Sequence, residues 1–176
     1  MGAFSGDRIV ILILRLFHIV AGVFWAGSTI FSARFLLPAF KAAGPAAQPV
    51  LAEFAKRRVP AAMMGAALVN IISGIWLLLL DSSGNGAFIR SPMGRTLMVG
   101  GALAITALLL GLVVGMPTAR RMGAIAEAAR KRGGPPSADE AAELGRLQQR
   151  SGTVGVIAAV LLLLAVAAMA VARYVP

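Results

Sequence analysis

The chain contains no cysteine, a single histidine and only seven acidic residues, and each shortage excludes a class of function. Without cysteine there is no disulfide, no thiolate catalysis and no thiolate-ligated metal. A Ser-His-Asp triad would have to use His18, and no acid lies in the apolar segment around it. No carboxylate interrupts any long apolar segment, which argues against a carboxylate-driven proton or sodium pump. The sequence also lacks a phosphate-binding loop and a His-Glu-x-x-His zinc motif.

Apolar residues are abundant: they make up 59% of the 176 residues, and the mean hydropathy is +0.84. A soluble domain needs far more polar surface. Four apolar segments approach or exceed the roughly 20 residues that a helix needs to cross a bilayer, and they do not alternate as strands do. The sequence predicts an all-α fold, a polytopic four-transmembrane-helix bundle in contact with lipid. We expect a single membrane domain over 1–176, with helices at about 9–37, 59–80, 96–116 and 152–172.

The connections carry helix-start signals. Ser91 followed by Pro92 is typical of an N-cap and first helical position. Ser137 with Glu140 matches a capping box, so a helix should begin there. The connector at 117–151 should therefore be a cytoplasmic loop into which the third and fourth helices extend as a hairpin.

The formal charge is +10, from 17 basic and seven acidic residues. Twelve of the basic residues lie in 34–58 and 120–150, and the other five lie on the opposite side of the predicted spans. By the positive-inside rule, the first and third loops face the cytoplasm and both termini lie outside the inner (cytoplasmic) membrane. The excess charge thus indicates topology and anionic lipid headgroups, and no recognition module suggests nucleic acid as a partner.

One face of the first span carries the candidate functional residues. Arg15, His18, Gly22, Trp25 and Thr29 are spaced three or four apart, so they share a helix face. An arginine and a histidine at membrane depth are costly against lipid, so this face should point into the bundle. Gly22 leaves room for a flat ligand or for a close helix. His18 is therefore either a ligand of haem or metal, a proton relay, or a neutral packing residue.

Other residues suggest helix packing. Asn70 falls at a depth similar to that of His18, so the two side chains could form a hydrogen bond between their helices. Such a bond stabilises a membrane protein by about 0.6 kcal/mol on average. Small residues recur along the third span and permit close backbone approach, within the bundle or through self-association or other membrane subunits. Packing roles are predicted for Asn70, Gly74, Gly100, Ala104 and Gly111.

Short motifs carry a family resemblance. The stretch Leu16-Phe17-His18-Ile19 with Trp25-Ala26-Gly27, and Gly74-Ile75-Trp76-Leu77, resemble the membrane-bound, oxygen-independent protoporphyrinogen oxidases and the membrane domain of the copper-resistance protein D family. The resemblance implies that His18 ligates haem b, and that Arg95 falls about where the oxidases carry a lysine. Residues 35–40 lack the second histidine of the oxidases.

Three functions remain open at this point. The first is a redox protein that holds b-type haem or a metal through His18, with Met63, Met98 or a second protomer's histidine as a further ligand. The second is a non-catalytic accessory subunit of a larger membrane complex. The third is a copper or small-solute permease. For the first, the predicted cofactor-binding residues are His18, Arg15, Gly22, Trp25 and Arg95, and His18 is also the predicted metal ligand.

Overall fold

The computed structural model describes residues 3–82 and 86–176, and all the secondary structure in these ranges is helical. The first half comprises α1 (Ala3–Phe31), the π-helix η1 (Ser32–Leu36), α2 (Leu37–Ala43), the 3-10 turn η2 (Gly44–Ala47), α3 (Gln48–Lys56) and α4 (Val59–Ser82). The second half comprises α5 (Gly86–Arg90), α6 (Pro92–Leu110), the π-helix η3 (Gly111–Gly115), α7 (Met116–Lys131), α8 (Ala138–Val171) and the 3-10 turn η4 (Ala172–Tyr174). The predicted all-α, four-helix bundle is confirmed.

The distribution of side chains is that of a membrane protein. Four helical runs are long and apolar enough to cross a bilayer, and most of their large apolar side chains point outward. The buried core is built mainly from small residues, which allow the helices to approach closely. Its members are Trp25, Ala26, Ala67, Ala104, Ala107, Ala158, Leu162 and Ala165. An apolar exterior around a small-residue core is stable only where lipid covers that exterior.

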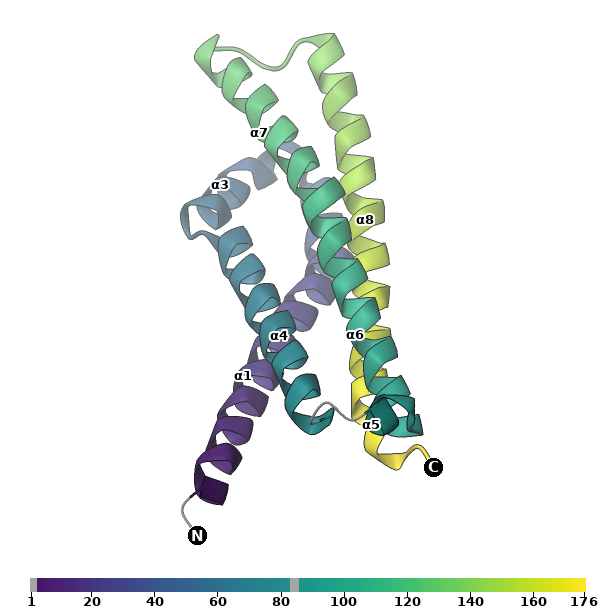
Figure 1. Ribbon diagram of the computed structural model, residues 1–176. Helices are drawn as coiled ribbons and strands as arrows, with labels where there is room; N and C mark the ends of the chain where they lie inside the picture. The colour runs from purple at the N-terminus through teal and green to yellow at the C-terminus, as the bar shows by residue number, and fades with distance from the viewer. Residues whose placement is uncertain (1–2, 83–85) are drawn as a thin grey trace.

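The bundle consists of two antiparallel helix pairs (Figure 1). Helices α1 and α4 cross one another, α6 runs along α8, and α1 also contacts α8. The start of α1, the short α5 and the C-terminus lie at one end of the molecule, here called the terminal end. Helix α3 and the tip of the α7–α8 pair lie at the other end, here called the hairpin end.

The helices of the second pair extend beyond their predicted limits. Helical structure runs without a break from Pro92 to Lys131, and the connector expected at 117–151 is helical except around residues 132–137. The Ser137 capping box is confirmed: the Ser137 Oγ accepts from the Glu140 amide at 3.3 Å, and a Glu140 carboxylate oxygen accepts from the Ser137 amide at 2.8 Å. The Ser91 cap on α6 is also confirmed. These caps supply partners for backbone amides that a helix start leaves unpaired.

Both π-helices have a proline just beyond them. Pro38 is the second residue after η1, and Pro117 is the second residue after η3. A proline inside a helix donates no amide hydrogen and crowds the carbonyl four residues before it. The wider π turn relieves that crowding while the helix continues. Both π-helices contact α8, so the bulges shape the surface of the bundle near its hairpin end.

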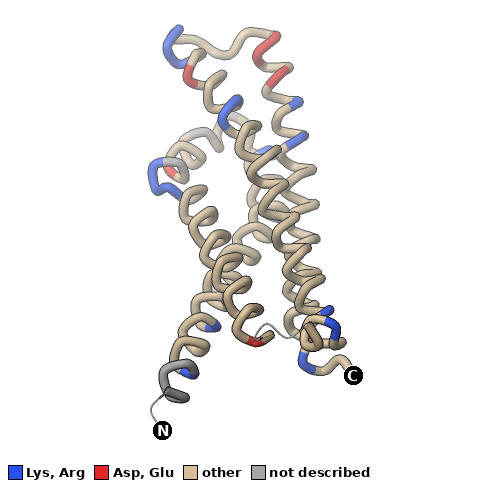
Figure 2. The backbone as a smooth tube through the Cα atoms, viewed as in Figure 1, with Lys and Arg blue, Asp and Glu red and all other residues tan. Residues whose placement is uncertain are grey.

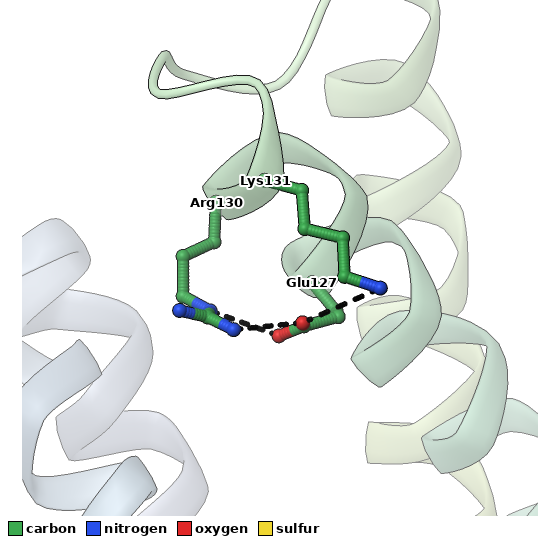
Figure 3. A network of polar contacts seen from close by, with 3 residues as sticks. All are labelled: Glu127, Arg130 and Lys131. Atoms are coloured by element: carbon green, nitrogen blue, oxygen red, sulfur yellow. Dashed lines mark hydrogen bonds and ion pairs between the residues drawn. The ribbon is translucent and has the colours of Figure 1, made fainter.

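Charged residues concentrate at the two ends, and the middle of the bundle is almost free of them (Figure 2). At the hairpin end, the Arg121 guanidinium donates two hydrogen bonds to the Glu143 carboxylate, at 2.7 and 2.9 Å, and so links α7 to α8. Glu127 accepts from Arg130 at 2.8 and 2.9 Å and lies 3.8 Å from the Lys131 ammonium (Figure 3). Arg132 pairs with Glu140.

The Arg121–Glu143 pair predicts that the hairpin loosens in acid. Hydrogen bonding to Arg121 lowers the pKa of Glu143, which lies beyond the uncharged stretch of α8. A depressed folded pKa stabilises the hairpin above the unfolded value of about 4.3, and the stabilisation is lost as the pH falls through the folded pKa. Spin labels placed on α7 and α8 near the tip should report a longer mean distance at about pH 3 than at about pH 6. In Arg121→Gln, the distance should change less with pH. An unchanged distance in the unmodified chain would contradict this.

Candidate functional site

At the crossing of α1 and α4, each helix places a polar side chain over a glycine of the other. The His18 ring lies over Gly74: a Cβ added at Gly74 would stand 2.7 Å from the ring carbon Cε1. The Asn70 amide lies over Gly22: a Cβ added there would stand 2.6 Å from Nδ2. The partners are four residues apart on both helices, as one face of each helix requires. Neither side chain could occupy its place if the facing glycine carried a methyl group.

Hydrogen bonds fix the two side chains in this arrangement. The His18 Nδ1 lies 2.8 Å from the backbone carbonyl of Asn70, and a carbonyl can only accept. The Asn70 Nδ2, which is a donor, lies farther from the same nitrogen, at 3.3 Å, so the closer carbonyl places the ring proton on Nδ1. In return, the Asn70 Nδ2 donates to the backbone carbonyl of His18 at 2.8 Å. The Ser73 hydroxyl donates to the Val69 carbonyl at 2.6 Å, and its oxygen lies 3.4 Å from the same Nδ1 as a second, longer acceptor.

The assigned tautomer leaves the other ring nitrogen as an acceptor. In the tautomer that carries its proton on Nδ1, the lone pair of the imidazole is on Nε2. Nε2 makes no hydrogen bond to any residue that the structure describes. An Nδ1 proton held by a backbone carbonyl is the usual arrangement of a histidine that ligates a metal through Nε2. The helix contact therefore holds the ring by Nδ1 and leaves Nε2 as the nitrogen that could accept a bond.

A cavity of about 820 Å³ lies between the two helix pairs, and His18 is part of its wall. Its volume is within the range of cofactor and small-molecule sites. The wall is mainly apolar and is contributed by α1, α4, α6 and the C-terminal end of α8 with η4. The polar lining consists of His18 and Asn70 together with three charged residues, Arg15, Asp81 and Arg173.

The charged residues mark the mouth of this cavity at the terminal end. On α4, Asp81 follows the uncharged residues 59–80, and Gly74 lies seven residues inside it, about 10 Å along the helix. The Arg15 guanidinium lies 3.5 Å from the Asp81 carboxylate, so its side chain extends toward the membrane surface. Arg173 is the first charged residue after the uncharged residues 151–172. The mouth of the cavity thus carries two arginines and one aspartate, and its mainly apolar interior includes His18 and Asn70.

The structure brings together only some of the residues predicted to bind a cofactor. Arg15 and His18 line the cavity, whereas Gly22 is covered by Asn70, and Trp25 is buried in the core at 7% exposure. Arg95 is exposed and does not contribute to the described wall. Of the two methionines proposed as ligands, Met98 lines the cavity and Met63 does not.

Of the charged residues and methionines in the cavity wall, sequence reasoning missed Asp81, Arg173, Met93 and Met169. The signal for the first two was their position as the charged residues that end an apolar stretch. Which of several such residues faces inward depends on how each helix is rotated, and Arg95 has the same signal without lining the cavity. No comparable signal distinguishes Met169 from an ordinary apolar residue.

The predicted packing residues lie in different surroundings. Asn70 and Gly74 form the α1–α4 contact described above. Gly100 faces α8, where an added Cβ would stand 3.1 Å from the Met169 methyl and 3.3 Å from the Ala165 carbonyl. Ala104 is buried in the same core. A Cβ at Gly111 would meet nothing within 4 Å, so a packing role for that residue would require a second chain.

The close contact between α1 and α4 predicts that the stability of the protein depends strongly on Gly22 and Gly74. Gly74→Ala should force the His18 ring to move and lower the free energy of unfolding by about 1–3 kcal/mol, the usual cost of overpacking. Gly65→Ala on the same helix is the matched control, because a Cβ there meets nothing within 4 Å. Gly22→Ala and Gly27→Ala form the corresponding pair on α1. Steric-trap unfolding in bicelles would measure the difference, and equal stabilities within a pair would contradict the described contact.

The chain was compared with protein families, curated proteins and solved structures. No family model, no curated protein and no solved structure matches the chain. The chain is a helical membrane protein.

Proposed function

We propose that this chain is a membrane redox protein whose cavity between the two helix pairs would hold b-type haem, with Nε2 of His18 as the protein's nitrogen ligand. The observation that carries the proposal is the His18 imidazole on the wall of an 820 Å³ cavity: its Nδ1 lies 2.8 Å from the Asn70 carbonyl, and its Nε2 has no hydrogen-bond partner among the described residues. The haem would supply one-electron chemistry.

The charge of the cavity mouth suits the carboxylates of such a cofactor. Arg15 and Arg173 line the mouth, and guanidinium groups pair with carboxylates through charge-assisted hydrogen bonds. Arg15 already pairs with Asp81 at 3.5 Å, so a haem propionate could take the place of that carboxylate. The apolar wall would exclude water from the macrocycle. A cofactor with an anionic edge and an apolar body therefore matches both parts of the cavity.

Ligands from cysteine or a second histidine are absent from the chain. Among the described residues, no group of three His, Asp or Glu side chains could hold a bare metal ion. Three methionines line the cavity, namely Met93, Met98 and Met169, and their thioethers are suitable ligands for haem iron. If one of these methionines joined His18 in holding the iron, the reduction potential should be higher than two histidines would give.

The proposal predicts that haem binding depends on His18. Protein purified after expression with ample haem should show a Soret band and a b-type reduced-minus-oxidised spectrum, and His18→Ala should lose both. Helical circular dichroism and gel filtration of the variant would show that the bundle still folds. The absence of a Soret band in the unmodified protein would overturn the proposal, as would its retention in His18→Ala.

A comparison of Met98 with Met63 tests whether a methionine also ligates the iron. If Met98 ligates the iron, Met98→Leu should lower the reduction potential and alter the spectrum, because a thioether ligand is lost. Met63→Leu is the matched control, since Met63 does not line the cavity. Met93→Leu and Met169→Leu, at the other two methionines of the cavity wall, are compared with the same Met63→Leu control. If no cavity methionine changes the potential or the spectrum, methionine ligation is wrong, although His18 ligation would still stand.

A second function, as an accessory subunit packed against other membrane helices, is favoured by Gly111 and Gly115 in η3. A Cβ at either residue meets nothing within 4 Å in the described chain, so a helix of another chain could approach this face closely. Gly111→Leu should then weaken self-association or association with a partner in mild detergent. Val113→Leu, at a highly exposed position in the same π-helix, is the control. An unchanged oligomeric state would mean that the face contacts lipid.

A further inference from the structure

A second pocket lies at the hairpin end, between α8 and η3, and shares no lining residue with the cavity that contains His18. It measures about 380 Å³ and is lined by Val114, Arg146, Gln149, Arg150, Thr153 and Val154. Residues 146, 149, 150 and 153 recur at the three- and four-residue spacing that places side chains on one helix face. Two guanidinium groups, a side-chain amide and a hydroxyl therefore converge on one open pocket.

The two arginines of this pocket have no acidic partner among the described residues. Glu143 lies one turn before Arg146, but its carboxylate is occupied by both hydrogen bonds from Arg121. The Thr153 hydroxyl donates to the Gln149 carbonyl at 3.2 Å, which leaves the hydroxyl oxygen as an acceptor only. The neighbouring arginines of the hairpin, Arg130 and Arg132, are both paired. The pocket therefore carries two arginines without an ion pair among the described residues, and the one acidic neighbour, Glu143 beside Arg146, is hydrogen-bonded to Arg121.

The depth of the pocket places these charges at the membrane surface. Arg150 is the last charged residue before 22 uncharged residues, 151–172, whose helical length of about 33 Å matches the hydrocarbon core of a bilayer. Val114 and Val154 lie on the apolar side of that boundary and complete the wall. The pocket thus joins a cationic part at headgroup level to an apolar part at acyl-chain level. A soluble anion would use only the first.

We propose that this pocket binds an anionic phospholipid, with Arg146 and Arg150 on the lipid phosphate and the acyl chain against Val114 and Val154. Arginine suits this role because its planar guanidinium can donate two parallel hydrogen bonds to one phosphate. Gln149 adds amide donors for the headgroup. Because the lipid would contact both α8 and η3, it would hold these two helices together where the α7–α8 hairpin meets the membrane.

The proposal is tested by lipid retention in native mass spectrometry and by thermal unfolding in nanodiscs of phosphatidylglycerol or phosphatidylcholine. The unmodified protein should retain phosphatidylglycerol in preference to phosphatidylcholine. Arg146→Gln with Arg150→Gln should bind it about tenfold to thirtyfold more weakly, from the usual contribution of two basic residues at a membrane surface. The matched control is Arg130→Gln with Arg132→Gln, which removes the same charge from the hairpin but leaves the pocket intact.

Lysine substitutions and inorganic phosphate provide two further tests of lipid binding in this pocket. Arg146→Lys with Arg150→Lys should recover part of the binding, because the charge returns without the bidentate geometry. The proposal fails if the control pair weakens binding as much as the pocket pair, or if the two lipids are retained equally. It also fails if inorganic phosphate displaces the lipid, since the pocket would then be a site for soluble anions. Haem content plays no part in these readouts, so they are independent of the function proposed for His18.

Discussion

The polar contact between α1 and α4 is the constraint on which the rest of the structure depends. In an apolar medium, the half-buried imidazole of His18 and the buried amide of Asn70 are costly unless their N–H groups find acceptors. His18 and Asn70 pair with each other's backbone, at 2.8 Å in both directions, and the facing glycines admit them. Each such bond in a membrane contributes little on its own. The contact's larger effect is to fix the register of the two helices and the orientation of the imidazole.

Fixing this crossing also creates the cavity. Helices α1 and α4 are held tightly where they cross, and α6 and α8 are held by small residues such as Gly100 and Ala104 along their length. The two pairs therefore behave as two packed units, and the space between them at the terminal end remains unfilled. The imidazole lies in the wall of that space because Gly74 brings α4 against its Nδ1 side. One contact thus determines the fold of a helix pair, the tautomer of His18 and the access to Nε2.

Much of this arrangement was predictable from the sequence. The four spans followed from the length of the apolar segments, and the helix starts at Ser91 and Ser137 followed from capping chemistry. The similar depth of His18 and Asn70 could be counted along the two helices. The sequence showed that Gly22 leaves room but not whether a ligand or a helix fills it, because that depends on a partner 48 residues away. The sequence also did not show which arginines face the cavity, because the rotation of each helix is set by its packing against the other helices.

The central claim is that the helix contact places the His18 proton on Nδ1 and leaves Nε2 free to ligate. Because His18 is the only histidine, protein labelled with ¹⁵N-histidine has just two ring-nitrogen signals, and both can be assigned without ambiguity. The measurement is a ¹⁵N NMR spectrum of the labelled protein in bilayers, prepared without added haem, near neutral pH. Our account predicts a protonated Nδ1 and an unprotonated Nε2. A proton on Nε2, or on both nitrogens, would contradict it.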